Sequence, residues 1–210
     1  MSEKGILIVV SGFSGSGKGT LMKVLLEKYH NYALSISATT RKPREGEIDG
    51  YHYFFKSIDE FEKMIAKDEL IEYAKYVDNY YGTPKVYVEE QLKCGKDVIL
   101  EIEIQGALKV KEKFPEAVLL FVTPPSVSVL EKRLIGRGTE TLEVIESRMQ
   151  RAAEEADGMD NYDYIIINDD IERCRDEVHQ IIQGEHYRGF RNIEFMNHIK
   201  EELKSHLKGE

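Results

Sequence analysis

ILIVVSGFSGSGKGTLMKVLLEKY, the stretch from Ile6 to Tyr29, passes from an apolar run through a cluster of glycines into a helical pattern. The apolar run predicts a buried strand, and GFSGSGK behind it fits the phosphate-loop pattern G-x-x-x-x-G-K. Glycines accept positive φ, so that consecutive N–H groups can turn toward an anion, and a helix presents its positive end there. We therefore expect Gly12, Gly17 and Lys18 to form a phosphate-binding loop. The alternative is a glycine-rich turn that binds nothing.

The position after Lys18 departs from the commonest form of this loop. Ser or Thr usually stands there and coordinates a metal ion, but this chain has Gly19, with Thr20 one place later. The sequence GKGT resembles the loops of nucleoside monophosphate kinases, in which Mg²⁺ is held largely through water and the nucleotide phosphates. On this resemblance we expect Thr20 to hydrogen-bond a phosphate, and the loop to serve a kinase that acts on a small phosphorylated acceptor.

The composition limits the class of protein and its partners. The 210 residues are 41% hydrophobic and carry a formal net charge of −9, which suits one domain with a substantial core. An acidic chain is a poor candidate for nucleic-acid or membrane binding, and we expect neither. The two cysteines predict reduced thiols, and the six histidines form no metal-binding pattern. The apolar run near the N-terminus is too short for a signal peptide or a membrane span, so we expect a cytoplasmic protein. Homo-oligomerisation is compatible with the sequence, and nothing in it decides the oligomeric state.

Apolar β-branched runs alternate with amphipathic stretches along most of the chain. The runs read as buried strands because their hydrophobicity is continuous, as in a parallel sheet covered on both faces: 6–10, 97–104, 117–122 and 162–168. Helical patterns cover residues 18–29, 107–113, 126–135, 141–157 and 171–183. This alternation predicts an α/β fold, a P-loop NTPase-type parallel sheet with helices on both faces.

Two segments interrupt this alternation. Residues 37–82 are rich in tyrosine and paired charges, and we expect them to form a small, mostly antiparallel inserted lobe with one helix near 58–67. Residues 131–158 contain two arginine-bearing helical stretches around a glycine hinge, and we expect a helical lid there. The single domain, 1–210, would then have a core of residues 1–36, 83–130 and 159–190. A helical tail, either solvated or docked, would follow at about 191–210.

A second group of residues suited to a phosphate lies in SISATTRKPREGEIDGYHYF. Arg41 and Arg44 stand three residues apart, with Ser37 before them and Tyr53 after them. Two guanidinium forks and a phenol that converge on one point suit a phosphate dianion. Either arginine alone could equally be a solvated charge in a turn.

Several motifs occur together in one order: SGFSGSGKGT, SISATTRKPREGEIDGYHY, LIEYAKYVDNYYGTP, LEIEIQGA, LIGRGTETLEVIESRM and NYDYIIINDD. In this set, which covers roughly residues 5–187, the chain resembles the guanylate kinase family. One motif alone would be weak, but the ordered set is highly specific. The resemblance implies transfer of the γ-phosphoryl group of ATP to GMP, with Mg²⁺ as cofactor, and an inserted GMP-binding lobe.

The resemblance also implies roles for individual residues. ATP would be bound by Gly12, Ser14, Gly15, Ser16, Gly17, Lys18, Gly19, Thr20, Arg133 and Asn168. The GMP phosphate would be held by Arg41, Arg44, Tyr53 and Tyr81, and guanine would be read by Ser37, Glu72, Thr83 and Glu103. Catalysis would rest on Lys18, Arg41, Arg137 and Arg148. Asn168 and Asp169 would lie on the adenine side.

The chemistry of guanine gives Glu72 independent support. A carboxylate can accept hydrogen bonds from guanine N1–H and the 2-amino group, whereas adenine has a lone pair at N1 and lacks the 2-amino group. The alternative for Glu72 is an exposed carboxylate on a strand.

The two carboxylates of LEIEIQGA, Glu101 and Glu103, depart from the family pattern. The family often has Asp at one or both positions, so each side chain here reaches one methylene further. Glu103 could therefore touch the base directly or through water, and Glu101 could support the Mg²⁺ shell.

Arg133, Arg137 and Arg148 match the lid arginines of the family. A surface helix charge is the alternative for each of them, because Lys132 and Arg151 lie close by without an assigned role.

Three other functions compete with this interpretation. A peptide-binding scaffold module is disfavoured because the phosphate loop is intact. A kinase for AMP is disfavoured by the combination of Glu72, Tyr81 and Thr83. A GTPase switch is disfavoured because the chain has no NKxD guanine signature.

Overall fold

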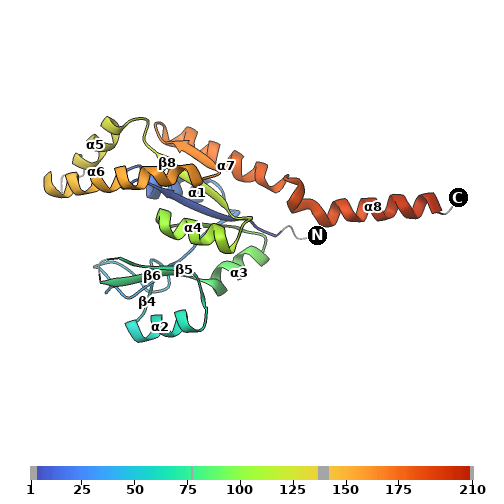
Figure 1. Cartoon of the computed structure of the whole chain (residues 1–210), viewed down its shortest axis with the longest axis horizontal. Helices are drawn as coiled ribbons and strands as arrows, with labels where there is room; N and C mark the ends of the chain where they lie inside the picture. The colour runs from blue at the N-terminus through green and yellow to red at the C-terminus, as the bar shows by residue number, and fades with distance from the viewer. Residues whose placement is uncertain (1–3, 77, 137–141, 209–210) are drawn as a thin grey trace.

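The computed structural model describes residues 4–76, 78–136 and 142–208. Within these ranges the larger sheet has five strands, all parallel, in the order β2-β7-β1-β8-β9 (Figure 1). The strands are β1 (Leu7–Gly12), β2 (Tyr32–Leu34), β7 (Asp97–Glu101), β8 (Val118–Thr123) and β9 (Tyr164–Ile167). The chain builds β2 and β7 on one side of β1 and then β8 and β9 on the other. The carboxyl end of β1 is therefore a topological switch point, the place where open α/β sheets bind ligands.

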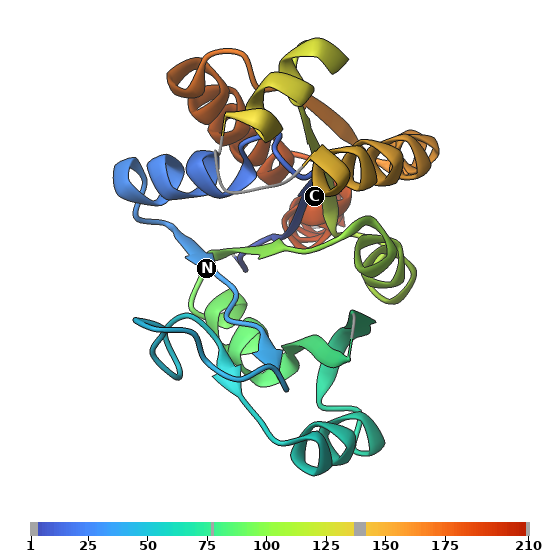
Figure 2. The ribbon, with the colours of Figure 1, turned by 90° about the vertical axis from the view of Figure 1, so that its left-hand side faces the viewer.

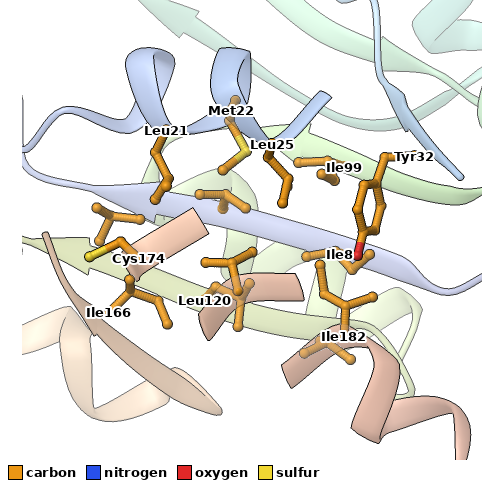
Figure 3. Close-up of a cluster of buried hydrophobic side chains, with 14 of the residues drawn as sticks. Ile8, Leu21, Met22, Leu25, Tyr32, Ile99, Leu120, Ile166, Cys174 and Ile182 are labelled. Atoms are coloured by element: carbon orange, nitrogen blue, oxygen red, sulfur yellow. The ribbon is translucent and has the colours of Figure 1, made fainter. Parts of the chain in front are cut away.

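Helices cover both faces of this sheet. Alternate residues of β1 enter opposite cores, with Ile8 and Val10 on one side and Leu7 and Val9 on the other. Figure 3 shows the first core, in which α1 and α7 pack on the sheet through residues such as Leu21 and Ile182. The second core lies under α3 and α4. The four helices are α1 (Lys18–Lys28), α3 (Lys85–Lys93), α4 (Ile104–Lys113) and α7 (Ile171–His186).

A smaller sheet with the strand order β4-β3-β6-β5 forms the inserted lobe. Its strands are β3 (Ala38–Thr39), β4 (Phe54–Phe55), β5 (Leu70–Tyr76) and β6 (Asn79–Pro84). The pairs β3–β6 and β5–β6 are antiparallel, whereas β3–β4 is parallel. Helix α2 (Ile58–Ala66) starts with a capping box between Ser57 and Glu60 and buries Phe61 against the sheet. The small sheet extends to Pro84, two residues past the expected boundary of the lobe.

Helices α5 (Val127–Ile135) and α6 (Leu142–Ala156) pack together over a separate apolar cluster that includes Phe13 and Phe121. In Figure 2 they lie at the opposite end of the molecule from the small sheet and α2. The turns η1 (Asp157–Asn161) and η2 (Gly189–Asn192) follow α6 and α7. Helix α8 (Ile193–Lys208) then projects away from the body of the molecule (Figure 1), and residues 193–207 are all exposed.

The parallel sheet, the helices on both faces and the inserted lobe confirm the predicted fold class. One predicted strand, 97–104, was too long: it ends at Glu101, and Ile104 opens α4 instead. Strand β2 and helix α3 were not predicted. Cys94 and Cys174 are both free thiols. No helix within the described ranges is long and apolar enough to cross a membrane.

Candidate nucleotide-binding site

The glycines after β1 form a loop that opens onto the start of α1. Gly12, Gly15 and Gly17 have φ values of 149°, 91° and 93°, which side chains rarely allow. A Cβ on Gly12 would stand 2.0 Å from the Val122 carbonyl oxygen, so this position also lacks space for one. Gly17 caps α1 without a side-chain bond, and the first turn carries no acidic residue. No side-chain cap or first-turn acid therefore neutralises the positive N-terminal end of α1, which suits an anion.

The loop is braced from the opposite side by β9 and α5. The Ser16 carbonyl oxygen accepts bonds from Asn168 Nδ2 at 2.8 Å and Arg133 Nη1 at 3.0 Å. Arg133 Nη2 also donates to the Asn168 carbonyl at 2.7 Å, and Asn168 is only 5% exposed. Ser16, expected as an ATP contact, is fully buried and donates its N–H to the Phe13 carbonyl. Its bonds hold the shape of the loop.

A cavity of about 450 Å³ lies beside this loop. It is lined by Gly15, Gly17, Thr20, Arg133, Asn168, Asp169, Asp170 and Ile171. The sequence analysis singled out the first six of these residues, and the structure adds Asp170 and Ile171 at the start of α7. Arg148 reaches the same loop from α6, because its Nη1 donates to Ser14 Oγ at 3.0 Å. Arg137, the remaining lid arginine, lies outside the described residues.

Lys18, Gly19 and Glu101 meet at the mouth of the loop. Lys18 Nζ donates to the carbonyl oxygens of Gly12 and Phe13. A Cβ on Gly19 would stand 3.9 Å from Glu101 Oε1, so the glycine leaves room beside this carboxylate. Glu101 keeps a solvent-exposed surface, but the protein packed behind it desolvates the carboxylate and raises its pKa, an effect that the charge of Lys18 opposes.

Arg41, Tyr53 and Tyr81 converge in the small sheet. The Arg41 guanidinium lies 5.2 Å from the centre of the Tyr53 ring, and the rings of Tyr53 and Tyr81 are 6.4 Å apart. Arg44 is exposed in the turn that follows β3. Arg41 also forms a two-armed salt bridge with Glu47, with both N–O distances 2.9 Å. The sequence analysis missed Glu47, although a carboxylate within the same tight basic turn was a usable signal.

Glu72 and Thr83 form a second polar group in the small sheet. Glu72 is 6% exposed on β5, and its Oε1 accepts a 2.8 Å bond from Thr83 Oγ1 on β6. Burial raises the pKa of Glu72, while Thr83, Lys109 and Lys113 oppose that shift. A Cβ on Gly106 would come within 3.1 Å of Glu72 Oε2, so the first turn of α4 is close to this carboxylate. Nothing in the sequence alone pointed to Gly106.

Ser37 and Glu103 occupy the edges of this region. Ser37 is half-buried before β3, and its carbonyl accepts the Phe54 N–H at 2.9 Å. Glu103 precedes α4 and is exposed, and its carboxylate lies 3.3 Å from Arg151 Nη2 on α6. Arg151 had no role in the sequence analysis, and it connects the lid helix to a residue expected to read guanine.

Comparison with known proteins agrees with this arrangement. The guanylate kinase family model matches residues 4–185. A guanylate kinase from Halalkalibacterium halodurans is 53% identical over 199 residues, which cover 95% of this chain and 98% of that protein. One from Lactococcus lactis is 52% identical and covers 97% of this chain and 100% of that protein. The crystal structure of guanylate kinase from Anaplasma phagocytophilum superposes with a TM-score of 0.73 at 32% identity, covering 90% of each chain. The chain belongs to the guanylate kinase family.

Proposed function

We propose that this chain transfers the γ-phosphoryl group of ATP to GMP and releases ADP and GDP. The observation that carries the proposal is the buried Glu72 carboxylate, held by Thr83 in a sheet separate from the phosphate loop. The carboxylate can accept from guanine N1–H and the 2-amino group. AMP would leave the acceptor positions that guanine uses buried without a donor, which strongly disfavours that acceptor.

The donor nucleotide would occupy the cavity at the switch point. Backbone N–H groups of the loop from Gly12 to Thr20 and the start of α1 would hold its phosphates, with Lys18 as a mobile charge. Arg133 and Asn168 line the cavity and fix the loop through Ser16. Arg148 donates to Ser14 in the loop and would contact the transferring phosphoryl group from there. We propose the same phosphate-binding role for Arg137, and the support there is its position in the lid sequence alone.

The acceptor nucleotide would bind on the small sheet. Arg41, Arg44, Tyr53 and Tyr81 would hold its phosphate, and Ser37, Glu72, Thr83 and Glu103 would contact guanine. The support is the convergence of Arg41, Tyr53 and Tyr81 at one place and of Glu72 and Thr83 at another. A nucleoside monophosphate has the same two parts, an anionic end and a base with hydrogen-bonding edges.

The residues beside the loop fit a Mg²⁺ ion that is carried by the nucleotide. Within the described ranges no group of three or more His, Cys, Asp or Glu side chains could hold a metal ion. Glu101 is the carboxylate beside Gly19, where the usual hydroxyl ligand is absent. We therefore propose coordination by nucleotide phosphates and water, with Glu101 holding part of the water shell. Bound there, Mg²⁺ would neutralise phosphate charge.

Phosphoryl transfer needs little acid–base chemistry from the protein, because the acceptor phosphate oxygen is already anionic. The protein must bring the two nucleotide phosphates into line and must stabilise the negative charge on the phosphoryl group during its transfer. Lys18 and the arginines of α5, α6 and the segment between them would supply that charge. Closure of these helices would exclude water that could otherwise hydrolyse ATP.

This activity places the protein in purine nucleotide metabolism, where it would return GMP to the diphosphate pool. We infer a cytoplasmic location from the two free cysteines, which suit a reducing compartment.

The proposal is tested by ADP production from ATP and Mg²⁺ with GMP, AMP, UMP or no acceptor. We expect turnover with GMP alone. Turnover with AMP in place of GMP would show that the small sheet reads a different base. ADP release at the same rate without an acceptor would show an ATPase.

A further inference from the structure

Glu47 holds Arg41 in a fixed position before any ligand is present. Its Oε2 and Oε1 accept from Arg41 Nη1 and Nη2, both at 2.9 Å, and Oε2 also accepts the Arg44 N–H at 2.7 Å. The two side chains are 16% and 17% exposed, far less than a typical surface ion pair. This carboxylate therefore ties together both arginines expected at the acceptor phosphate.

The turn from Arg44 to Glu47 brings the Glu47 carboxylate back onto Arg41. The Glu47 N–H donates to the Arg44 carbonyl at 3.1 Å. Gly46 in this turn has a φ of 83°, and its α-carbon faces open space. Behind the pair, the Arg41 guanidinium lies over the rings of Tyr53 and Phe55, at 5.2 and 5.8 Å. A salt bridge on one side and aromatic rings on the other leave the guanidinium few alternative positions.

The salt bridge leaves part of the guanidinium available to a ligand. Nη1 donates to Glu47 and to the Lys42 carbonyl, and Nη2 donates once to Glu47. These bonds use three of the five N–H donors of an arginine, so the edge formed by Nε and Nη2 can still meet a phosphate. The Arg41 pKa is raised first by Glu47 and then, to a smaller extent, by Tyr81, which places that phenol close to the guanidinium.

We propose that Glu47 is a positioning residue for the acceptor phosphate, which orders Arg41 and the Arg44 backbone so that the phosphate meets a preformed fork. The proposal rests on the function proposed above. Two effects of Glu47 oppose each other: its negative charge repels a phosphate dianion, and its bonds remove the need to order a long side chain on binding. We expect ordering to dominate, because Glu47 is itself neutralised by Arg41, and the pKa of Glu47 is lowered to about 2 by that guanidinium and the Arg44 N–H.

The test compares Glu47→Gln with Glu45→Gln, a matched loss of charge two residues away at an exposed position. Glutamine cannot accept hydrogen bonds on both arms, so it breaks the two-armed bridge without changing the size of the side chain. We expect KM for GMP to rise about 10-fold in Glu47→Gln, the size expected when one long side chain must be ordered on binding. KM for ATP and the inhibition constant of guanosine, which has no phosphate, stay unchanged. Glu45→Gln behaves as wild type.

A double-mutant cycle with Arg41→Ala separates positioning from a structural role. Because Glu47 acts mainly through Arg41, we expect Glu47→Gln to raise KM for GMP much less in the Arg41→Ala background than in the wild type. Only the part that acts through the Arg44 N–H should remain there. An additive effect there, a KM for GMP that is unchanged or lower in Glu47→Gln, or an equal weakening of guanosine inhibition would each overturn the proposal. Wild-type protein that turns over without GMP dependence would instead overturn the proposed function and this inference with it.

Discussion

Lys18 is the residue on which the proposed binding of the donor nucleotide depends most. It lies at the mouth of the phosphate loop, where Gly12 and Phe13 carbonyls hold its ammonium group. We expect Lys18→Ala to lower kcat about 10²–10³-fold, the loss typical of removing one charge-stabilising donor. GMP affinity should change little, because Glu72 lies in the small sheet and Arg41 in the loop that follows its strand β3. Lys23→Ala, an exposed change on the same helix, is the control. Near-normal turnover in Lys18→Ala would remove this residue from the phosphate site.

We expect Glu72 to make guanine binding sensitive to acid. Burial raises its pKa, and the ionised form is the one that accepts from guanine. Affinity for guanosine should be full above this raised pKa and fall as pH drops through it. Guanosine is the right probe because it lacks a phosphate that titrates. In Glu72→Gln the dependence should disappear, and affinity should fall roughly 10- to 100-fold through the loss of hydrogen bonds to a charged group. A pH-independent guanosine affinity in wild type would exclude an ionised Glu72 from base reading.

Guanosine affinity should rise with pH, whereas the contribution of Glu72 to the stability of the ligand-free protein should fall with pH. Because the folded pKa of Glu72 is above its unfolded value, its contribution to stability is full below the unfolded pKa and is lost as pH rises through the folded pKa. Glu72→Gln should therefore raise Tm at pH 7 relative to wild type more than it does at pH 4. Thermal unfolding at the two pH values measures this difference directly.

At the scale of single residues, the sequence could reveal groups whose chemical type the reaction requires. Lys18, Arg41 and Glu72 are proposed on this ground. It could not reveal groups that act through a neighbour brought close by folding. The Asn168 side chain bonds to the Ser16 carbonyl, although the two residues are 152 positions apart in the sequence. Gly106 lies close to Glu72 only because α4 packs beside β5.

Among the helices and strands, α8 should contribute least to the stability of the fold. Its residues 193–207 are all exposed, whereas Arg191 just before it bonds the Glu116 carbonyl. We expect deletion of residues 193–210 to shift Tm by less than about 2 °C, since it removes little buried surface. Turnover with GMP should stay unchanged. A larger loss of stability, or a change in the mass of the particle in solution, would show that the exposed helix has a partner.

The elements themselves were predicted where hydrophobic pattern and length agreed. The long apolar runs predicted β1 and β8, and the helical spacing of apolar residues predicted α1 and α7. Strand β2 has three residues, too few for a pattern to be recognised. Helix α3 was missed because it follows directly from β6 at Pro84, without a turn signal between them. Ile104 was assigned to a strand because apolar continuity does not show where a strand ends and a buried helix begins.

The whole molecule has its two proposed nucleotide sites at separate sheets, and α4 contacts both sheets. Lys113 and Lys109 of this helix donate to the carbonyl oxygens of Ile71 and Tyr73, on either side of Glu72 in β5. The same helix packs against β1, the strand that leads into the phosphate loop. The two negatively charged nucleotides would thus bind at separate places, and α4 would fix the position of one proposed site relative to the other. This relation depends on tertiary packing, which no single motif encodes.

The most direct test of transfer between these two sites follows the phosphoryl group itself. The protein is given Mg²⁺ and ATP labelled at the γ-phosphate, with GMP and AMP present at equal concentration. We predict that the label appears in GDP and that none accumulates in ADP or inorganic phosphate, since Glu72 rejects adenine and transfer requires an acceptor. Label in ADP would contradict the assignment of the small sheet to guanine, and label in inorganic phosphate would contradict transfer between the sites.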